Sequence, residues 1–157
     1  MDIYSYLIAD HRKVAKLMDD LLEINLQAVQ QRLFQEIRTE LILHAGAEEV
    51  VFYKALADAA ARDETVGRDL RHAWHEHSDI RALLDQLTQA SVASARWMEI
   101  FGELKHAVES HVAEEETEVF AEARHLIDPD RADTMGDEMD DAKVMIRAQL
   151  SIPEVTQ

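Results

Sequence analysis

Apolar residues recur every three or four positions along almost the whole chain, which is the spacing of the buried face of an α-helix. This pattern predicts four long helices, over residues 3–24, 26–61, 64–90 and 94–127. The segments between them are short and polar, and tight connections make successive helices antiparallel neighbours. The pattern therefore indicates an all-α bundle of four helices.

A fifth helical segment is expected after the bundle. Asp128 and Pro129 predict an additional C-terminal helix over residues 129–150, because Asp is a good N-cap and Pro fits the first helical turn. Apolar positions are sparse in this segment, so we expect it to lie across the bundle and outside its centre. Pro153 ends any continuation of the helix, and residues 151–157 are expected to form a loose tail.

The composition supports a single helical domain. The chain has 157 residues and no linker rich in Gly, Ser or Pro, so we expect one domain over residues 1–150 whose bundle core spans 3–127. Only 4 Gly and 2 Pro are present, which argues against the many tight turns of a β-fold. The absence of Cys excludes disulfides and thiolate ligands, so a bound metal must accept nitrogen and oxygen ligands.

The chain is strongly acidic, with 32 Asp and Glu against 16 Lys and Arg and a formal net charge of −16. Such a surface repels phosphate backbones and anionic lipids, so neither nucleic acid nor a membrane is expected as a partner. The first residues lack the basic and apolar regions of a signal peptide, and no apolar run is long enough to span a membrane. We therefore expect a cytoplasmic protein, with an oligomeric state that the sequence leaves open.

Polar residues interrupt the apolar faces of the four predicted helices in a pattern that occurs twice. In both halves of the chain, a His with a carboxylate before it is followed, at nearly the same spacing, by a His-x-x-x-Glu-Glu motif and an aromatic residue. The repeated inward positions are His11, His44 and Glu48 in the first half, and His77, His111 and Glu115 in the second.

This constellation predicts a metal site. A single His on an apolar face is usually a satisfied core residue, and a single His-x-x-x-Glu is usually an exposed pair. Two such pairs and two further His at matching positions are better explained by ligation, because buried carboxylates without partners are costly. Imidazole and carboxylate ligands suit iron, manganese or zinc, and the duplication favours two metal ions.

The motifs resemble the hemerythrin-like, or HHE cation-binding, domains over residues 3–127. The resemblance implies an up-down-up-down antiparallel four-helix bundle around a non-haem di-iron site, with two iron ions in an oxo- or hydroxo-bridged pair. It implies the following ligands: His11 and His44 for one iron, His77 and His111 for the other, and Glu48 and Glu115 as bridges.

One position departs from the oxygen-carrying hemerythrins, which have His-x-x-x-His on the third helix. Four residues before His77 this chain has Ala73, so one ligand is missing and no replacement is evident from the sequence. An open coordination position favours reaction with oxygen, peroxide or nitric oxide over reversible oxygen carriage. We therefore expect a protein that binds a metal and a small diatomic or peroxide ligand, for sensing, scavenging or iron handling, rather than a dedicated enzyme.

Three alternatives remain at this point. Repair of damaged iron centres is disfavoured because such relatives usually carry an additional Cys-containing segment. Ferritin-like iron oxidation uses Glu-x-x-His on two helices, whereas this chain has the motif once, at Glu122 and His125. A metal-free interaction module with an acidic face would leave Glu48 and Glu115 unexplained unless buried His protons neutralise them.

The other polar and aromatic residues near the motifs are assigned to different roles. We expect Glu49 and Glu116 to be solvated, with hydrogen bonding to the ligand His as the alternative, and we expect Tyr53 and Phe120 to pack between helices. The remaining His are expected to lie off the ligand face or too far along a helix to reach a metal: His72, His75, His106 and His125.

Overall fold

The computed structural model describes residues 1–150, in which every regular element is a helix. Two of the long helices contain a five-residue π-helical segment, η1 or η2. The elements in chain order are α1 (Ile3–Glu23), α2 (Gln27–Glu48), η1 (Glu49–Tyr53), α3 (Lys54–Ala59), α4 (Glu64–Gln89), α5 (Ala95–Glu114), η2 (Glu115–Val119), α6 (Phe120–Leu126) and α7 (Pro129–Gln149).

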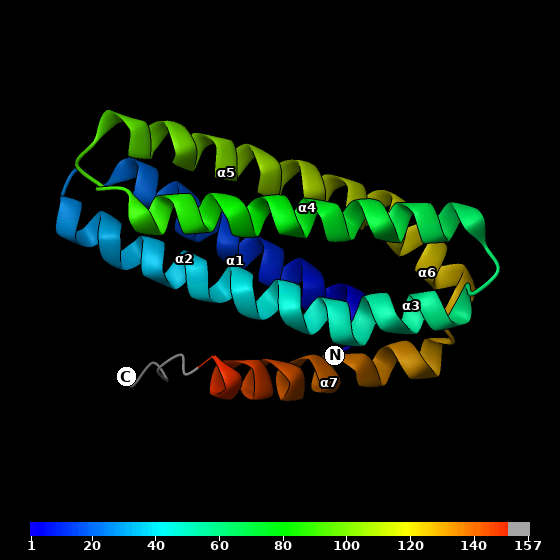
Figure 1. The fold of residues 1–157 in the computed structure, drawn as a ribbon. Helices are drawn as coiled ribbons and strands as arrows, with labels where there is room; N and C mark the ends of the chain where they lie inside the picture. The colour runs from blue at the N-terminus through cyan, green and yellow to red at the C-terminus, as the bar shows by residue number, and fades with distance from the viewer. Residues whose placement is uncertain (151–157) are drawn as a thin grey trace.

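The helices form a bundle in which each long segment returns beside the preceding one (Figure 1). The segments α2, η1 and α3 follow one another without a break, as do α5, η2 and α6, so each set is one long and slightly irregular helix. The predicted all-α fold with four bundle helices and an additional C-terminal helix is confirmed. The π-helical segments were not predicted.

Short polar side chains begin four of the helices. Asp2, Asp63, Ser94 and Asp128 each accept a hydrogen bond from a backbone N–H group of the first helical turn, which is the role of an N-cap. The predicted beginning of α7 at Asp128 is therefore confirmed. The caps satisfy donors that a helix beginning would otherwise leave without a partner.

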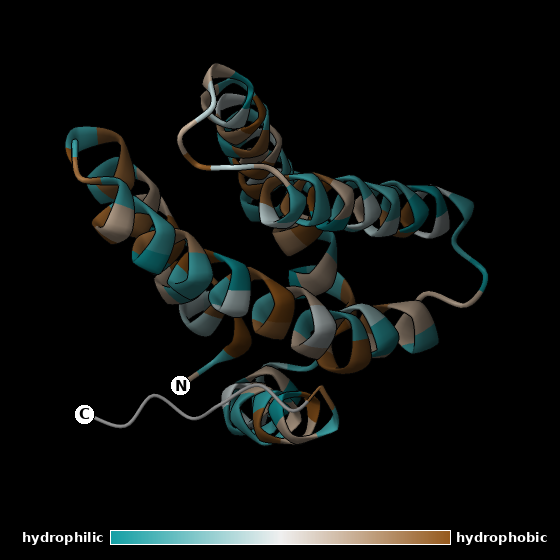
Figure 2. Cartoon of the chain, turned by 60° about the vertical axis from the view of Figure 1, so that its left-hand side comes forward, coloured by the Kyte–Doolittle hydropathy of each residue, from teal (hydrophilic) through white to brown (hydrophobic). Residues whose placement is uncertain are grey.

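Two hydrophobic clusters fill the bundle. One contains Leu7, Phe52 and Val119, and the other contains Val14 and Leu41. Hydrophilic and hydrophobic stretches alternate along the helices, as expected for amphipathic segments (Figure 2). Within residues 1–150, none of the helices combines the length and apolar character needed to cross a membrane.

The layer between the two clusters contains the buried polar residues. His11 stands between Leu7 and Val14 along α1, so its neighbours on the same face belong to different clusters. His44 and Glu48 likewise follow Leu41, and the other repeated residues occupy the equivalent layer on α4, α5 and η2. The fold thus encloses a polar layer between two apolar ones.

Helix α7 packs on the outside of the four-helix bundle, against α1, α2 and η1. Its Met135 and Met139 are fully buried and extend the first hydrophobic cluster. The expectation that this helix stays out of the bundle centre is met. The tail expected over residues 151–157 lies outside the described residues.

Candidate metal centre

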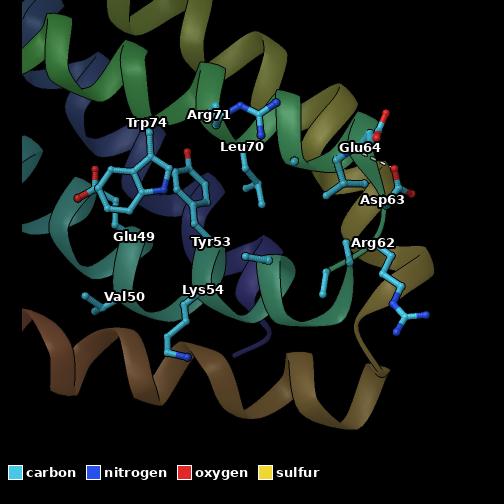
Figure 3. A pocket seen from close by; sticks show the side chains of 15 residues that line it. Glu49, Val50, Tyr53, Lys54, Arg62, Asp63, Glu64, Leu70, Arg71 and Trp74 are labelled. Atoms are coloured by element: carbon cyan, nitrogen blue, oxygen red, sulfur yellow. Dashed lines mark hydrogen bonds between the residues drawn. The ribbon is translucent and has the colours of Figure 1, made fainter.

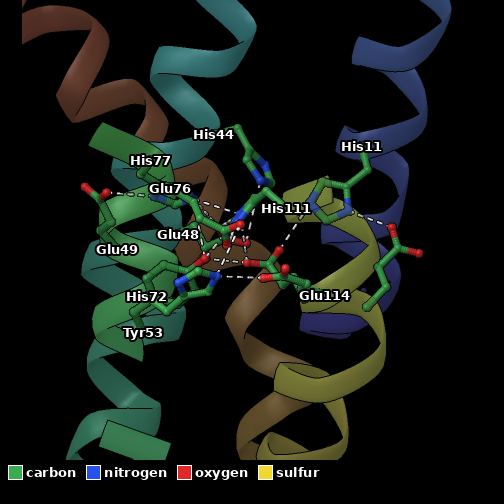
Figure 4. A network of polar contacts seen from close by, with 12 residues as sticks. His11, His44, Glu48, Glu49, Tyr53, His72, Glu76, His77, His111 and Glu114 are labelled. Carbon is green, nitrogen blue, oxygen red and sulfur yellow. Dashed lines mark hydrogen bonds and ion pairs between the residues drawn. The ribbon is translucent and has the colours of Figure 1, made fainter. Parts of the chain in front are cut away.

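The six repeated side chains converge in the polar layer, and each is at most 7% exposed (Figure 4). They form two overlapping groups in which one ligand atom from each residue lies within 4.8 Å of the others. Both carboxylates belong to both groups and therefore lie between two pairs of imidazoles. The groups are His11, His44, Glu48 and Glu115, and then Glu48, His77, His111 and Glu115.

Several atoms that face this centre make no hydrogen bond and have only ion-pair contacts within it, such as the 3.2 Å between Nε2 of His11 and Oε1 of Glu115. They are Nε2 of His11, Nε2 of His44, both carboxylate oxygens of Glu48, and Oε1 of Glu115. Burying charged carboxylate oxygens costs several kcal/mol, so the arrangement needs a compensating positive charge. The donor set fits a bound cation, because nitrogen and oxygen lone pairs point to a common place.

Each of the four His has a carboxylate partner on the side away from the centre. Because Nδ1 is in contact with an acceptor, it carries the proton and leaves the Nε2 lone pair for the centre. The Nδ1 to carboxylate distances are 2.8 Å for His11 to Glu116, 2.8 Å for His44 to Asp10, 2.7 Å for His77 to Glu49, and 3.0 Å for His111 to Glu76.

The expected solvation of Glu49 and Glu116 was therefore wrong, and the alternative, hydrogen bonding to the His of the predicted ligand set, is confirmed. Glu49 is only 7% exposed and also accepts two hydrogen bonds from Arg81, at 2.9 and 2.8 Å. The side chain of Glu116 is 30% exposed and still binds His11. Each residue follows an inward Glu in the sequence, but its partner is on another helix, which single-helix geometry does not reveal.

Tyr53 also belongs to the site, contrary to the prediction that it only packs between helices. Its hydroxyl donates to the Glu115 carboxylate and lies 3.4 Å from Nε2 of His77, and its ring stacks on that imidazole with centroids 5.3 Å apart. Tyr53 ends the π-helical segment η1, in which each turn holds an additional residue, so an α-helical register misplaces it. Phe120 packs in the apolar core as predicted.

The electrostatics of the protein without a cation reflect the same crowding of carboxylates. Burial alone would lower the pKa of His77, but its close contacts with the Glu48 and Glu49 carboxylates, at 3.1 and 2.7 Å, outweigh burial and raise that pKa. Burial opposes the shift in His111 also, but hydrogen bonds to carboxylates raise its pKa to about 12. Burial raises the pKa of Tyr53 well above its ordinary value, and neighbouring carboxylates add to the effect, so the phenol stays protonated.

Two cavities adjoin the centre. The four repeated His line a cavity of about 20 Å³. The rest of its lining is mainly aliphatic and includes Val14, Leu41 and Ile80. That volume holds about one water molecule. A larger cavity of about 820 Å³ lies between α3 and α4, with Tyr53 and Glu49 in its wall and none of the six repeated residues among its lining (Figure 3).

The remaining positions of interest behave as the sequence indicated. His72, His75, His106 and His125 are exposed and belong to neither of the two buried groups. Ala73 is buried at 4% exposure, so a methyl group stands where the oxygen carriers have His. No described His takes over that position in the two buried groups.

Comparison with known proteins agrees with this geometry. A protein of known structure, the Hemerythrin HHE cation binding domain-containing Rv2633c homolog from Mycobacterium kansasii, superposes with a TM-score of 0.78 and 21% identity over 97% of this chain and 93% of that one. A curated relative, the DNA nickase of Nostoc sp. (strain PCC 7120 / SAG 25.82 / UTEX 2576), is 27% identical over 150 residues. The match covers 96% of this chain and only 41% of that relative. The Hemerythrin HHE cation binding domain family matches residues 2–123, and the chain belongs to this family.

Proposed function

We propose that the protein is a non-haem di-iron protein whose site reacts with a small diatomic or peroxide ligand. The observation that carries this proposal is the pair of overlapping buried groups that share Glu48 and Glu115. In this assignment both carboxylates would be shared between the two ions. The terminal ligands are His11 and His44 for one iron, and His77 and His111 for the other.

Iron is favoured over manganese and zinc by membership of the family, since the nitrogen and oxygen ligands suit all three metals. Bound iron would supply one-electron redox chemistry that the side chains lack. The chain's own residues orient the site: four carboxylates hold the imidazoles through Nδ1, and Tyr53 keeps a proton on its hydroxyl beside Glu115. These groups orient the centre before a ligand arrives.

The size and lining of the adjacent cavity restrict what can react there. Its volume of about 20 Å³ and its largely aliphatic wall favour oxygen, nitric oxide or peroxide over larger substrates. Ala73 leaves one coordination position without a His, which favours reaction of such a ligand over its reversible carriage. We therefore propose sensing, scavenging or iron handling as the role, in the cytoplasm, within one domain that spans residues 1–150.

DNA nicking is the activity named for the Nostoc relative, and we do not extend it to this chain. The match covers only 41% of that protein, and the formal charge of −16 opposes binding to a phosphate backbone. A supercoiled-plasmid assay checks this directly. Metal-dependent conversion to the nicked form at physiological salt would reverse this assignment.

The test of the proposal is anaerobic purification after expression with iron, followed by metal counting and optical spectroscopy. We expect two irons per chain and a diferric absorption band that changes on addition of oxygen, peroxide or nitric oxide. His44→Ala should lower the iron content, whereas His106→Ala, on an exposed position, should keep it. A colourless wild-type protein without iron, or full iron content in His44→Ala, contradicts the proposal.

A further inference from the structure

A second group of ligand-type side chains lies at the surface beside the buried centre. Nε2 of His72 is 3.0 Å from Oε2 of Glu114 and 3.6 Å from Oε2 of Glu76 (Figure 4). One ligand atom from each of the three residues lies within 4.8 Å of the others. Oε1 of the same Glu76 accepts from Nδ1 of His111, so the surface group touches the polar layer.

A cavity of about 20 Å³ is lined both by this group and by the buried residues His111 and Glu115. At its outer side are the three surface residues and two further carboxylates, Asp69 and Glu118. At its inner side is Glu115, which is 1% exposed and whose Oε1 has no hydrogen-bond partner. Lys and Arg are absent from the described residues that line the cavity, so its carboxylates attract cations.

The equivalent carboxylate in the first half of the chain has a Lys partner, which this surface group lacks. Asp10 and Glu76 are equivalent, because each precedes a repeated His and each holds the His of the following helix. Asp10 is paired with Nζ of Lys143 from α7 at 2.6 Å, which supplies a positive charge. Glu76 instead shares its surroundings with His72 and a second carboxylate. A cation at the surface group would supply the charge that Lys143 supplies on the opposite side.

We propose that His72, Glu76 and Glu114 form a surface site for a divalent cation, and that cations reach the buried centre through it. The inference rests on the proposed function, since it assumes that the buried centre takes up metal. One imidazole and two carboxylates suit a ferrous ion that is still partly hydrated. Such an ion would exchange its remaining water ligands for protein ligands at the buried centre.

The experiment measures the rate at which the metal-free protein takes up Co²⁺, followed by stopped-flow absorption. The variant is His72→Ala/Glu114→Gln, which leaves Glu76 to orient His111. The matched control is His75→Ala/Asp79→Asn, an exposed pair on the same helix with Nε2 and Oδ2 3.7 Å apart. Both double substitutions remove one carboxylate and one imidazole, so they change the overall charge equally.

We expect uptake to slow by about tenfold in the His72→Ala/Glu114→Gln variant, which is the scale of local electrostatic attraction in a cleft. The final Co²⁺ content should equal that of the wild type, and the control should load at the wild-type rate. Equal rates in all three proteins, or equal slowing in both variants, overturn the inference. A wild-type protein that binds no Co²⁺ refutes the proposed function instead, so the two failures are distinguishable.

Discussion

Glu49→Gln tests whether the carboxylates behind the His contribute to metal affinity. Glu49 is 7% exposed, accepts from Nδ1 of His77 at 2.7 Å and pairs with both terminal nitrogens of Arg81. An amide can still accept one hydrogen bond, but it carries no charge to make the imidazole a stronger ligand. It also leaves the half-buried guanidinium with a weaker partner.

The expected loss is about 10–100-fold in metal affinity, which is the usual effect of removing such an outer partner. This corresponds to about 1.4–2.7 kcal/mol. The affinity is measured by competition between the protein and a chromophoric chelator for Co²⁺ or Fe²⁺. Circular dichroism of the metal-free variant checks that the bundle is intact.

Glu116→Gln is the matched control, because Glu116 occupies the equivalent position in the second half of the chain. Its side chain is 30% exposed and its described contact is with His11 alone, so water can replace part of what the substitution removes. We expect the affinity to fall less than in Glu49→Gln. The reasoning is wrong if Glu49→Gln binds metal as tightly as the wild type, or if Glu116→Gln loses more affinity.

Three further outcomes follow from the packing and the charges. Trp97→Ala, at a site that is 1% exposed and far from the polar layer, should lower the free energy of unfolding by about 3–5 kcal/mol in urea titrations while metal content stays the same. Gly136→Ala would place a Cβ atom 2.2 Å from the carbonyl oxygen of Met1, so it should cost about 1–3 kcal/mol, and an unchanged melting temperature would refute that contact. The pKa values of Asp10 and Glu76 are lowered, since hydrogen bonds from imidazoles outweigh burial. The stability that these two carboxylates contribute is therefore present above their ordinary pKa values of 3.8 and 4.5 and should be lost as the pH falls below those values. Urea unfolding of the metal-free protein at two pH values, one on each side of this range, measures the loss.

The sequence was sufficient for the fold because each long helix carries an apolar face at helical spacing, and the repeated His and Glu residues that interrupt this face keep the same spacing. Leu41, His44 and Glu48 follow one another at spacings of three and four residues, which place them on one face of a helix. Periodicity therefore predicted both the helix and the inward direction of the two polar side chains. The Asp128 and Pro129 pair similarly located the beginning of α7. The convergence of the six residues followed from the repeat, since equivalent positions on four bundle helices share one layer.

The sequence could not reveal the partners that join different helices. Asp10 stands beside His11 in the chain but binds His44, and this choice depends on the rotation of α1 against α2. Tyr53 was missed for another reason, because a π-helical turn shifts the register by an amount that hydrophobic periodicity does not encode. Predicting either contact required the helix positions in three dimensions.

The charges around the centre offer an argument for two divalent ions rather than one. Six carboxylates surround the four imidazoles, and Lys143 and Arg81 each neutralise one of them, which leaves four negative charges among these groups when the imidazoles are neutral. Without metal, the raised pKa values of His77 and His111 show that protons make up part of the balance. Two divalent cations would replace those protons and balance all four charges, whereas a single ion would leave two uncompensated in a buried layer, where an unpaired charge is costly. The six carboxylates are Asp10, Glu48, Glu49, Glu76, Glu115 and Glu116.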